Sequence, residues 1–141
     1  MAPGNGSTTS PSGGRDGYGF SDPVTITPRL GTAEDWYYIN RTGDGHPMHV
    51  HLVRFQFVQR FYIKAADFDN KGLLTQVGPT LGALSFDQGW KDTILVPPGD
   101  GVNTYQVTVT RAQFTRTGAY PYHCHIIDHE DNDMMRWFQV V

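Results

Sequence analysis

Histidine and cysteine are confined to two short segments of this 141-residue chain. The first segment reads HPMHVH and covers residues 46–51, and the second reads HCHIIDHEDNDM and covers residues 123–134. Together they contain all six histidines and the single cysteine. Histidines used for packing or solubility would be scattered, whereas imidazole, thiolate and thioether ligands at fixed offsets are typical of a copper site. The two segments therefore predict copper binding and redox chemistry.

The second segment can serve two sites, because successive residues of a strand point to opposite faces. Cys124 then faces one side of the strand, and His123 and His125 face the other. With His129 five residues and Met134 ten residues further on, Cys124 has the ligand order of a blue copper centre, in which the thioether is the weak axial ligand. Such a centre still needs a second imidazole.

The first segment can supply that imidazole. His49 and His51 share a strand face, while His46 precedes Pro47 in the turn that enters the strand and can aim differently. His46 is therefore the predicted fourth ligand of the Cys124 site. Four imidazoles remain for a second metal region on the other side of the strand, and these are His49, His51, His123 and His125.

Each part of this pattern also has a purely structural interpretation. The histidines of an HxxHxH pattern can be solvated side chains, and a lone cysteine is most often a small buried hydrophobic residue. Met134 can equally be core filler, so its assignment as a ligand rests on its offset from Cys124. Zinc is the inorganic alternative, but it does not account for the histidines that flank the thiolate. Taken together, the two segments favour copper.

The elements that position these segments are predicted to be β-strands, with no helical period of useful length. Short stretches rich in Val, Ile, Thr, Tyr and Phe are separated by turn residues, for example at residues 42–45 and 97–101. This pattern predicts an all-β, Greek-key β-sandwich. The seven expected strands are residues 24–27, 35–40, 49–58, 93–96, 103–110, 119–123 and 136–141.

Two stretches depart from the strand pattern. Residues 1–22 are dominated by Gly, Ser, Thr and Pro, so we expect a flexible tail or linker before a single domain of residues 23–141. Residues 64–89 are weakly patterned and too long for a simple connection. We expect them to form a functional loop, such as a lid or a wall of a substrate site.

Composition argues against several functions. The formal charge of −3 and the thinly spread basic residues give no footprint for nucleic acid. The sequence contains no apolar stretch of membrane-spanning length, and its first twenty residues lack the pattern of a secretory signal. We therefore expect a soluble chain and no membrane span, with its compartment unknown and an extracytoplasmic location left open.

The motifs resemble the C-terminal cupredoxin domain of the multicopper oxidases, in the three-domain group that contains bacterial spore-coat laccases, bilirubin oxidases and phenoxazinone synthases. The resemblance runs from about residue 22 to residue 141. It rests on Glu34–Trp36 with Asn40, and on the stretches HPMHVHLVRFQF, GWKDT and YHCHIIDHEDNDMMR. The HCH segment is highly specific and GWKDT is supportive. A cupredoxin-like fold is implied.

The resemblance also implies a copper type for each ligand. Type 1 copper, which takes electrons from a small phenolic or similar reducing substrate, would be held by His46, Cys124, His129 and Met134. Type 2 copper would be held by His49. The type 3 pair would be held by His51, His123 and His125. Electrons would pass from Cys124 along the backbone to this trinuclear cluster, where dioxygen is reduced to water.

Two acidic residues have open roles. Glu130 matches a carboxylate that family members place near the trinuclear cluster, and we expect it to act catalytically in proton delivery. The structural alternative is a turn cap or an ion pair with Arg136. Asp92 can orient a ligand imidazole, since ligating histidines usually donate their second N–H to a carboxylate or carbonyl, or it can be a strand-edge charge.

The chain departs from the family it resembles in its histidine count. The family's trinuclear cluster uses eight histidines, four of them from two HxH motifs of an N-terminal domain that has no counterpart here. The resemblance therefore implies one complete type 1 site and half-supplied type 2 and type 3 sites. We expect another cupredoxin domain or chain with HxH motifs to supply the rest, and to complete the sandwich if strands before residue 22 are missing.

Three explanations for the missing half of the trinuclear copper ligands are open. The chain is a subunit of a naturally split oxidase, a fragment of a longer enzyme, or a domain that assembles with copies of itself, and the first two are favoured. The leading function is a component of a laccase-like oxidase. The alternative is a stand-alone blue copper electron carrier, and a copper storage module is disfavoured by the arrangement of the six histidines. With four methionines and no Met-rich insertion, organic donors are favoured over metal ions.

Overall fold

The computed structural model describes residues 19–131 and 134–141. Strands dominate these ranges, as the sequence predicts. The strands are β1 (Ala33–Asn40), β2 (His46–Val50), β3 (Phe55–Lys64), β4 (Gln76–Leu81), β5 (Thr93–Val96), β6 (Thr104–Gln113), β7 (Gly118–Cys124) and β8 (Met135–Val140). The short helices are α1 (Ala65–Lys71), η1 (Ser85–Asp87) and α2 (Ile127–Glu130). None of the described helices is long and apolar enough to cross a membrane.

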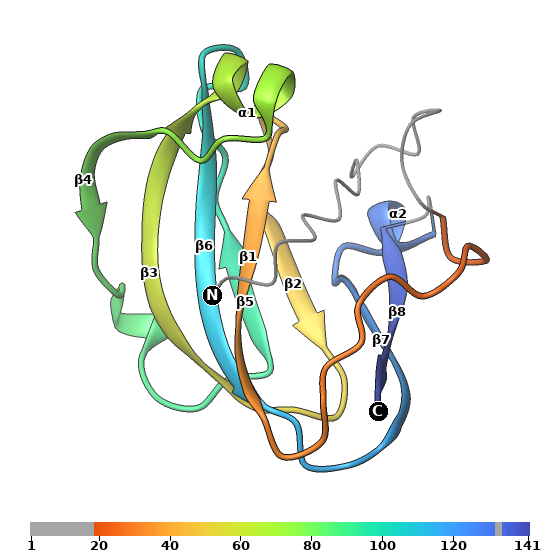
Figure 1. Ribbon diagram of the computed structural model, residues 1–141. Coiled ribbons are helices and arrows are strands. Elements are labelled where there is room, and N and C mark those ends of the chain that lie inside the picture. Colours follow the sequence, from red (N-terminus) through yellow and green to blue (C-terminus); the bar gives the residue numbers. More distant parts are fainter. Residues whose placement is uncertain (1–18, 132–133) are drawn as a thin grey trace.

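The strands form two antiparallel four-stranded sheets (Figure 1). Sheet A has the order β1-β6-β3-β4, and sheet B has the order β5-β2-β7-β8. Only β3-β4 and β7-β8 are consecutive strands in sequence, and the other four neighbouring pairs join strands that are not consecutive, because the chain crosses repeatedly between the sheets. This confirms the predicted all-β sandwich. Completion of the sandwich by another chain stays a prediction.

The prediction of one strand over residues 49–58 is wrong. The chain leaves sheet B after Val50 and enters sheet A at Phe55, so the segment contributes to two strands in different sheets. Leu52, between them, has a φ of 76°, in the left-handed region that bulky side chains seldom adopt. Apolar residues continue through the bend, and Val53 is buried beside Phe55. The alternation of apolar residues shifts by one position between Leu52 and Val53, and the prediction of one strand missed this signal.

The prediction of a strand over residues 24–27 is also wrong. This stretch is irregular, although it lies along β8 and accepts hydrogen bonds from it, with Gln139 N donating to Ile26 O and Val141 N donating to Pro28 O. Pro23 and Pro28 flank the stretch, and proline has no N–H to give to a ladder.

The predicted tail falls mostly outside the described residues, which begin at residue 19. Residues 19–22 form a turn in which Asp22 N donates to Gly19 O. The Arg136 guanidinium of β8 donates to Gly19 O, and the Phe20 and Trp137 rings lie 5.2 Å apart. The last residues of the expected tail are therefore held against sheet B.

Residues 64–89 do not form one long loop, although their weak patterning predicts one. They contain α1, β4 and η1, and β4 pairs with β3 at the edge of sheet A. Gly72 ends α1 in the left-handed conformation, with a φ of 65°. The elements are short and β4 is exposed throughout, which explains their weak hydrophobic pattern. Their predicted role beside a substrate is untested.

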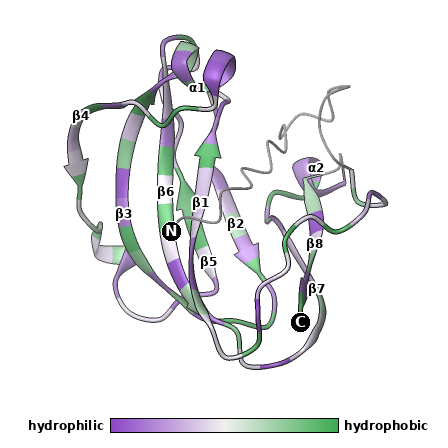
Figure 2. Cartoon of the chain, viewed as in Figure 1, coloured by the Kyte–Doolittle hydropathy of each residue, from purple (hydrophilic) through white to green (hydrophobic). Residues whose placement is uncertain are grey.

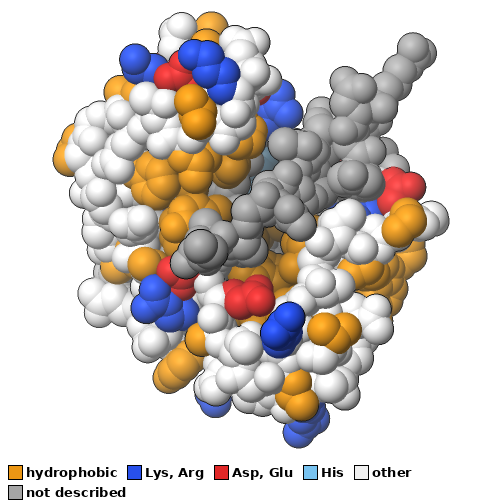
Figure 3. Space-filling view, in the orientation of Figure 1, with side chains coloured by type: hydrophobic (Ala, Val, Ile, Leu, Met, Phe, Trp, Pro, Cys, Tyr) orange, Lys and Arg blue, Asp and Glu red, His pale blue; other side chains and the backbone are white. Residues whose placement is uncertain are grey.

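Two hydrophobic clusters lie on opposite faces of sheet A. The larger lies between the sheets and contains Phe55, Phe114 and Phe138, each at most 1% exposed. The smaller lies on the outer face, where Val107 and Val109 of β6 alternate with inward residues. Hydrophobic and hydrophilic residues alternate along β3 and β6 (Figure 2), and hydrophobic side chains gather below α1 in the same view (Figure 3). Sheet A thus has an apolar cluster on both sides.

A buried ion pair fixes η1 to the inner side of sheet A. Arg60 of β3 forms two hydrogen bonds to the Asp87 carboxylate and a third to Leu95 O. Both side chains are at most 3% exposed. Burial raises the pKa of Asp87, but the hydrogen bonds from Arg60 and the Leu84 amide outweigh this effect and leave the pKa below its usual value.

We predict that Asp87→Ala destabilises the chain by about 3–5 kcal/mol, because it leaves the Arg60 charge buried without its partner. Urea denaturation of the metal-free protein measures the loss. Because folding depresses the Asp87 pKa, the stabilisation is present above the unfolded-state pKa, near 3.8, and is lost as pH falls through the folded-state value.

Asp35→Ala is the matched control, since it removes a carboxylate from Arg111, which is 61% exposed. A surface ion pair contributes little, so we expect a much smaller loss. Equal losses in the two variants would contradict the importance of the buried pair.

Candidate metal centre

The two ligand segments meet where β2 pairs with β7. Met48 lies opposite Cys124, and His49 lies opposite His123. Cross-strand partners share a face and successive residues alternate, so Cys124 faces the interior while His49 and His123 face outward. The ladder confirms the predicted separation of Cys124 from its flanking histidines.

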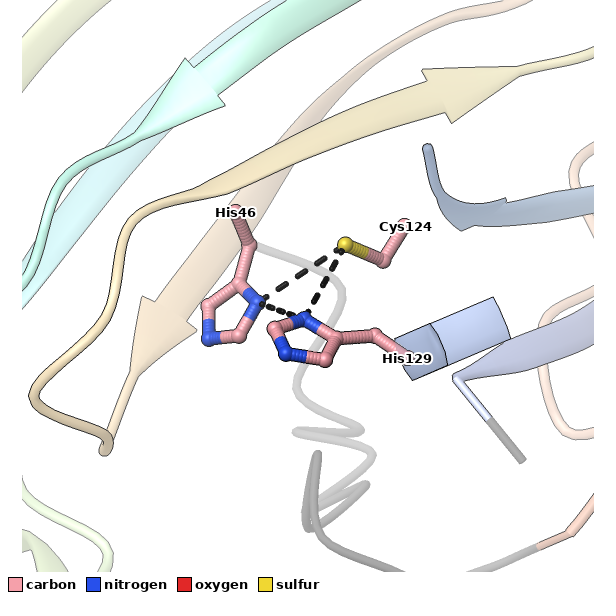
Figure 4. Close-up of side chains that lie close together, drawn as sticks. All are labelled: His46, Cys124 and His129. Atoms are coloured by element: carbon pink, nitrogen blue, oxygen red, sulfur yellow. Dashed lines mark hydrogen bonds between the residues drawn. The ribbon is translucent and has the colours of Figure 1, made fainter. Parts of the chain in front are cut away.

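One ligand group forms at the inner face (Figure 4). His46 comes from the first residue of β2, Cys124 from the last residue of β7, and His129 from α2. His46 Nδ1 lies 3.1 Å from His129 Nδ1, and Cys124 Sγ lies 3.7 Å from each of these nitrogens. Two imidazole nitrogens and one sulfur therefore converge on one point.

The triangle of donor atoms fits a transition metal. The point equidistant from the three atoms lies roughly 2 Å from each, close to the length of metal–imidazole bonds. Two imidazoles and one thiolate in a trigonal arrangement are the strong ligands of a blue copper centre. The chemistry of the donor set thus agrees with copper.

Burial affects the acid–base properties of these ligands. Cys124 is 0% exposed, and its burial raises the pKa of the thiol. His46 is 5% exposed, and burial together with the nearby His129 lowers its pKa. The neutral imidazole that a metal needs is therefore favoured at His46, whereas the thiol must lose a proton to bind.

Met134 lies at the end of the β7–β8 ladder. Cys124 N donates to Met134 O, and the ladder pairs the next residues, His123 with Met135. The register therefore places Met134 opposite Cys124, on the face that carries the thiol. Met134 N also donates to His129 O, which closes the loop from Cys124 through α2. This position is compatible with an axial ligand.

A second group of imidazoles lies on the outer face. His49, His51 and His123 each offer a nitrogen, and these nitrogens lie within 4.8 Å of one another. The His125 ring flanks them, at 5.9 Å from the His49 ring and 5.7 Å from the His123 ring. The structure therefore brings together all four histidines predicted for a second metal region.

Hydrogen bonds set which nitrogen of two of these rings can bind a metal. His49 Nδ1 lies 2.9 Å from Asp92 O and 3.1 Å from Thr93 Oγ1, and His123 Nδ1 lies 3.1 Å from Cys124 O. A carbonyl oxygen only accepts, so both Nδ1 atoms carry the proton and both Nε2 atoms keep the lone pair that a metal would bind, with His123 Nε2 lying 3.2 Å from His51 Nε2. The Asp92 backbone carbonyl therefore contacts His49 Nδ1 at 2.9 Å. The Asp92 carboxylate lies 3.9 Å from the same nitrogen, and the side chain is 65% exposed.

Glu130 lies beside the second group. Its carboxylate is 3.4 Å from His123 Nδ1, and the side chain is 29% exposed. The carboxylate therefore connects a ligand imidazole with solvent. This contact is compatible with a role in proton delivery and also with holding the His123 ring.

Exposure distinguishes the two groups. In the first, His46 and Cys124 are buried, and in the second, His51 and His125 are exposed. Exposed ligands are open to a second protein surface, whereas buried ones are not.

Sequence reasoning missed two hydroxyls that contact ligand rings. Thr93 contacts His49 Nδ1, and Thr42 lies 2.7 Å from His46 Nε2. Thr42 reads as a turn residue in the sequence. Its position four residues before His46 was the only available signal.

Comparisons with known proteins agree on one family. The family model described as "Multicopper oxidase" matches residues 2–141. A laccase of Bacillus subtilis is 40% identical over 117 residues, and Multicopper oxidase LPR1 of Arabidopsis thaliana is 33% identical over 147 residues. These matches cover 83% and 89% of this chain.

Solved structures give the same result. A laccase from Pediococcus acidilactici matches with a TM-score of 0.63 at 27% identity, over 89% of this chain and 23% of that protein. A multicopper oxidase of Aquifex aeolicus matches with a TM-score of 0.62 at 27% identity, over 86% of this chain and 23% of that protein.

This chain spans 22% of the Bacillus subtilis laccase and 25% of the Arabidopsis protein. The matched region contains both ligand segments and the two sheets that hold them. The chain belongs to the multicopper oxidase family.

Proposed function

We propose that this chain is the type 1 copper domain or subunit of a laccase-like oxidase and contributes half of a trinuclear copper cluster. The single observation that carries the proposal is the position of Cys124. Its thiol belongs to the first group with His46 and His129, while the adjacent His123 belongs to the second group on the outer face. The two groups are therefore joined by the single peptide bond between His123 and Cys124.

The proposed ligands are those predicted from the sequence. His46, Cys124, His129 and Met134 would hold type 1 copper, His49 would hold type 2 copper, and His51, His123 and His125 would hold the type 3 pair. Bound copper would accept single electrons from a small phenolic or similar reducing substrate at the first site and reduce dioxygen to water at the second.

The chain's own residues would prepare both sites. Burial of His46 and Cys124 excludes water from the first group. The carbonyls of Asp92 and Cys124 hold His49 and His123 with Nε2 free. The short covalent path from the Cys124 sulfur to the His123 ring spans on the order of 10 Å, over which electron transfer would be direct.

A partner must supply the remaining ligands under this proposal. All six histidines of the chain are already assigned, and the family it resembles uses eight at the trinuclear cluster alone. The exposure of His51 and His125 supports a second domain or chain with HxH motifs that docks on the outer face of sheet B. A stand-alone electron carrier is the alternative, because the buried group alone is sufficient for a blue copper site.

We predict that the purified monomeric chain, loaded with copper, has an intense visible thiolate band that a phenolic donor bleaches. Oxygen uptake should stay at the background rate, because the second site lacks half of its ligands. An oxygen electrode and absorption spectroscopy measure the two effects on one sample.

Cys124→Ser is the control, and it should abolish the band, since the thiolate is its source. A second test separates the two functions. Binding of copper beyond the first equivalent at the outer histidines, removed by His51→Ala, supports the oxidase component, and one tightly held copper supports the carrier. Catalytic oxygen uptake by a proven monomer would rule out the requirement for a partner.

We also propose that Glu130 delivers protons to the second site. Its carboxylate contacts His123 and is partly exposed, so it can take protons from solvent. We predict that Glu130→Gln slows oxygen uptake by the partner-completed oxidase about 10²–10⁴-fold, the range of general acid–base catalysis. Bleaching of the thiolate band by donor should be unchanged.

Glu130→Asp should restore part of the rate, because it keeps the carboxylate. Copper content of each variant is measured in parallel. If Glu130→Gln loses copper from the second site in proportion to its activity, the residue holds His123 and is not a proton donor.

A further inference from the structure

The His46 ring is the end of a chain of side-chain hydrogen bonds. Its Nε2, which faces away from the other ligands, lies 2.7 Å from Thr42 Oγ1. Thr42 Oγ1 lies 2.7 Å from Asn40 Oδ1, and Thr42 N donates to the same oxygen at 2.9 Å. Asn40 is the last residue of β1 and is 4% exposed. This series of hydrogen bonds therefore connects the buried Asn40 side chain with His46, a predicted copper ligand.

Only one orientation of the Asn40 amide agrees with its hydrogen-bond partners. Its Nδ2 lies within 3.1 Å of three carbonyl oxygens, those of Asp44, Val96 and Pro97. Carbonyl oxygens only accept, and a flipped amide would place its own oxygen against all three. Oδ1 must therefore face Thr42.

The direction of the remaining hydrogen bonds follows. The Thr42 hydroxyl has one proton, and it is surrounded by two groups that only accept, Asn40 Oδ1 at 2.7 Å and Asp44 O at 3.3 Å. The proton goes to Asn40, so the hydroxyl oxygen accepts from His46 Nε2–H. A neutral imidazole with a proton on Nε2 has its lone pair on Nδ1, the atom that faces Cys124 and His129.

We propose that Asn40 and Thr42 are positioning residues that fix the tautomer and the ring orientation of His46 for copper. The proposal rests on the proposed function of the Cys124 site. His49 and His123 obtain the same fixation from backbone carbonyls, which no substitution removes. At His46 the fixation comes from a side-chain hydroxyl, so it can be removed by one substitution.

The contribution of the Thr42 hydroxyl to His46 can be tested while the loop keeps its anchor to sheet B. Asn40 Nδ2 bonds to residues that end β5 or follow it, and so ties β1 to sheet B without using the Thr42 hydroxyl. The Thr42 backbone N–H keeps its own bond to Asn40. Thr42→Val therefore removes the hydroxyl's contacts to His46, Asn40 Oδ1 and Asp44, and retains the shape of the residue and the backbone anchor of the loop.

The first experiment uses the metal-free chain. ¹H–¹⁵N NMR of the imidazole nitrogens should show His46 as the Nε2–H tautomer in the wild type and a mixture of tautomers in Thr42→Val. Thr42→Ser should restore the single tautomer. A wild-type His46 that carries its proton on Nδ1 would overturn the proposal.

The second experiment measures copper. By competition titration, Thr42→Val should bind the first copper about 10- to 100-fold more weakly than wild type, the usual effect of losing the partner of a ligating histidine. The thiolate band should shift, and Thr42→Ser should restore both properties. Thr32→Val is the matched control, because Thr32 is half-buried and the substitution removes a 2.7 Å hydroxyl bond to Arg29 O in a turn remote from the histidines.

The outcomes separate this inference from the proposed function. Wild-type affinity and spectrum in Thr42→Val, or an equal loss in Thr32→Val, overturn the positioning role. A wild-type chain that binds copper without a thiolate band overturns the proposed function, and the NMR result then decides the tautomer by itself.

Discussion

The pairing of β2 with β7 is the interaction on which the rest of the site depends. It places Met48 against Cys124 and His49 against His123, although these partners are more than seventy residues apart in sequence. Because side chains alternate across a strand, one ladder sends the thiol inward and the imidazoles outward. A shift of one residue in this register would put the thiol outside and the histidines in the core. The surrounding hydrophobic cluster, which includes Val50 and Tyr122 from the same ladder, fixes the register.

Three imidazoles of the two groups, those of His46, His49 and His123, are prepared in one way, by a hydrogen bond that fixes the proton on the nitrogen facing away from the centre. Backbone carbonyls do this for His49 and His123, and the Thr42 hydroxyl does it for His46. The contrast lies in burial, since the thiolate group is enclosed and two of the outer histidines are exposed. The enclosed group is shielded from solvent, whereas the exposed histidines can be reached by a second protein surface.

The fold departs from the sequence-based prediction where backbone direction and edge pairing decide. In residues 49–58 the apolar alternation shifts by one position between Leu52 and Val53, where the chain turns from one sheet to the other. Residues 24–27 have strand composition, but flanking prolines leave them beside β8 without a regular ladder. Residues 64–89 have weak patterning because their strand is an exposed edge. For the first two segments the deciding contacts are with strands remote in sequence, whereas β4 pairs with β3, the strand before it in the chain.

The sequence by itself predicted copper chemistry, because imidazoles, thiol and thioether at short fixed offsets favour copper and a division of the side chains between two faces. It also determined the all-β class. Only the tertiary structure decided that His46 and His129 meet Cys124, that His49 is held by the Asp92 carbonyl, and that Thr42 contacts His46. The physical reason is that offsets along one strand fix side-chain direction, whereas contacts between segments depend on a register set by packing of the whole sandwich.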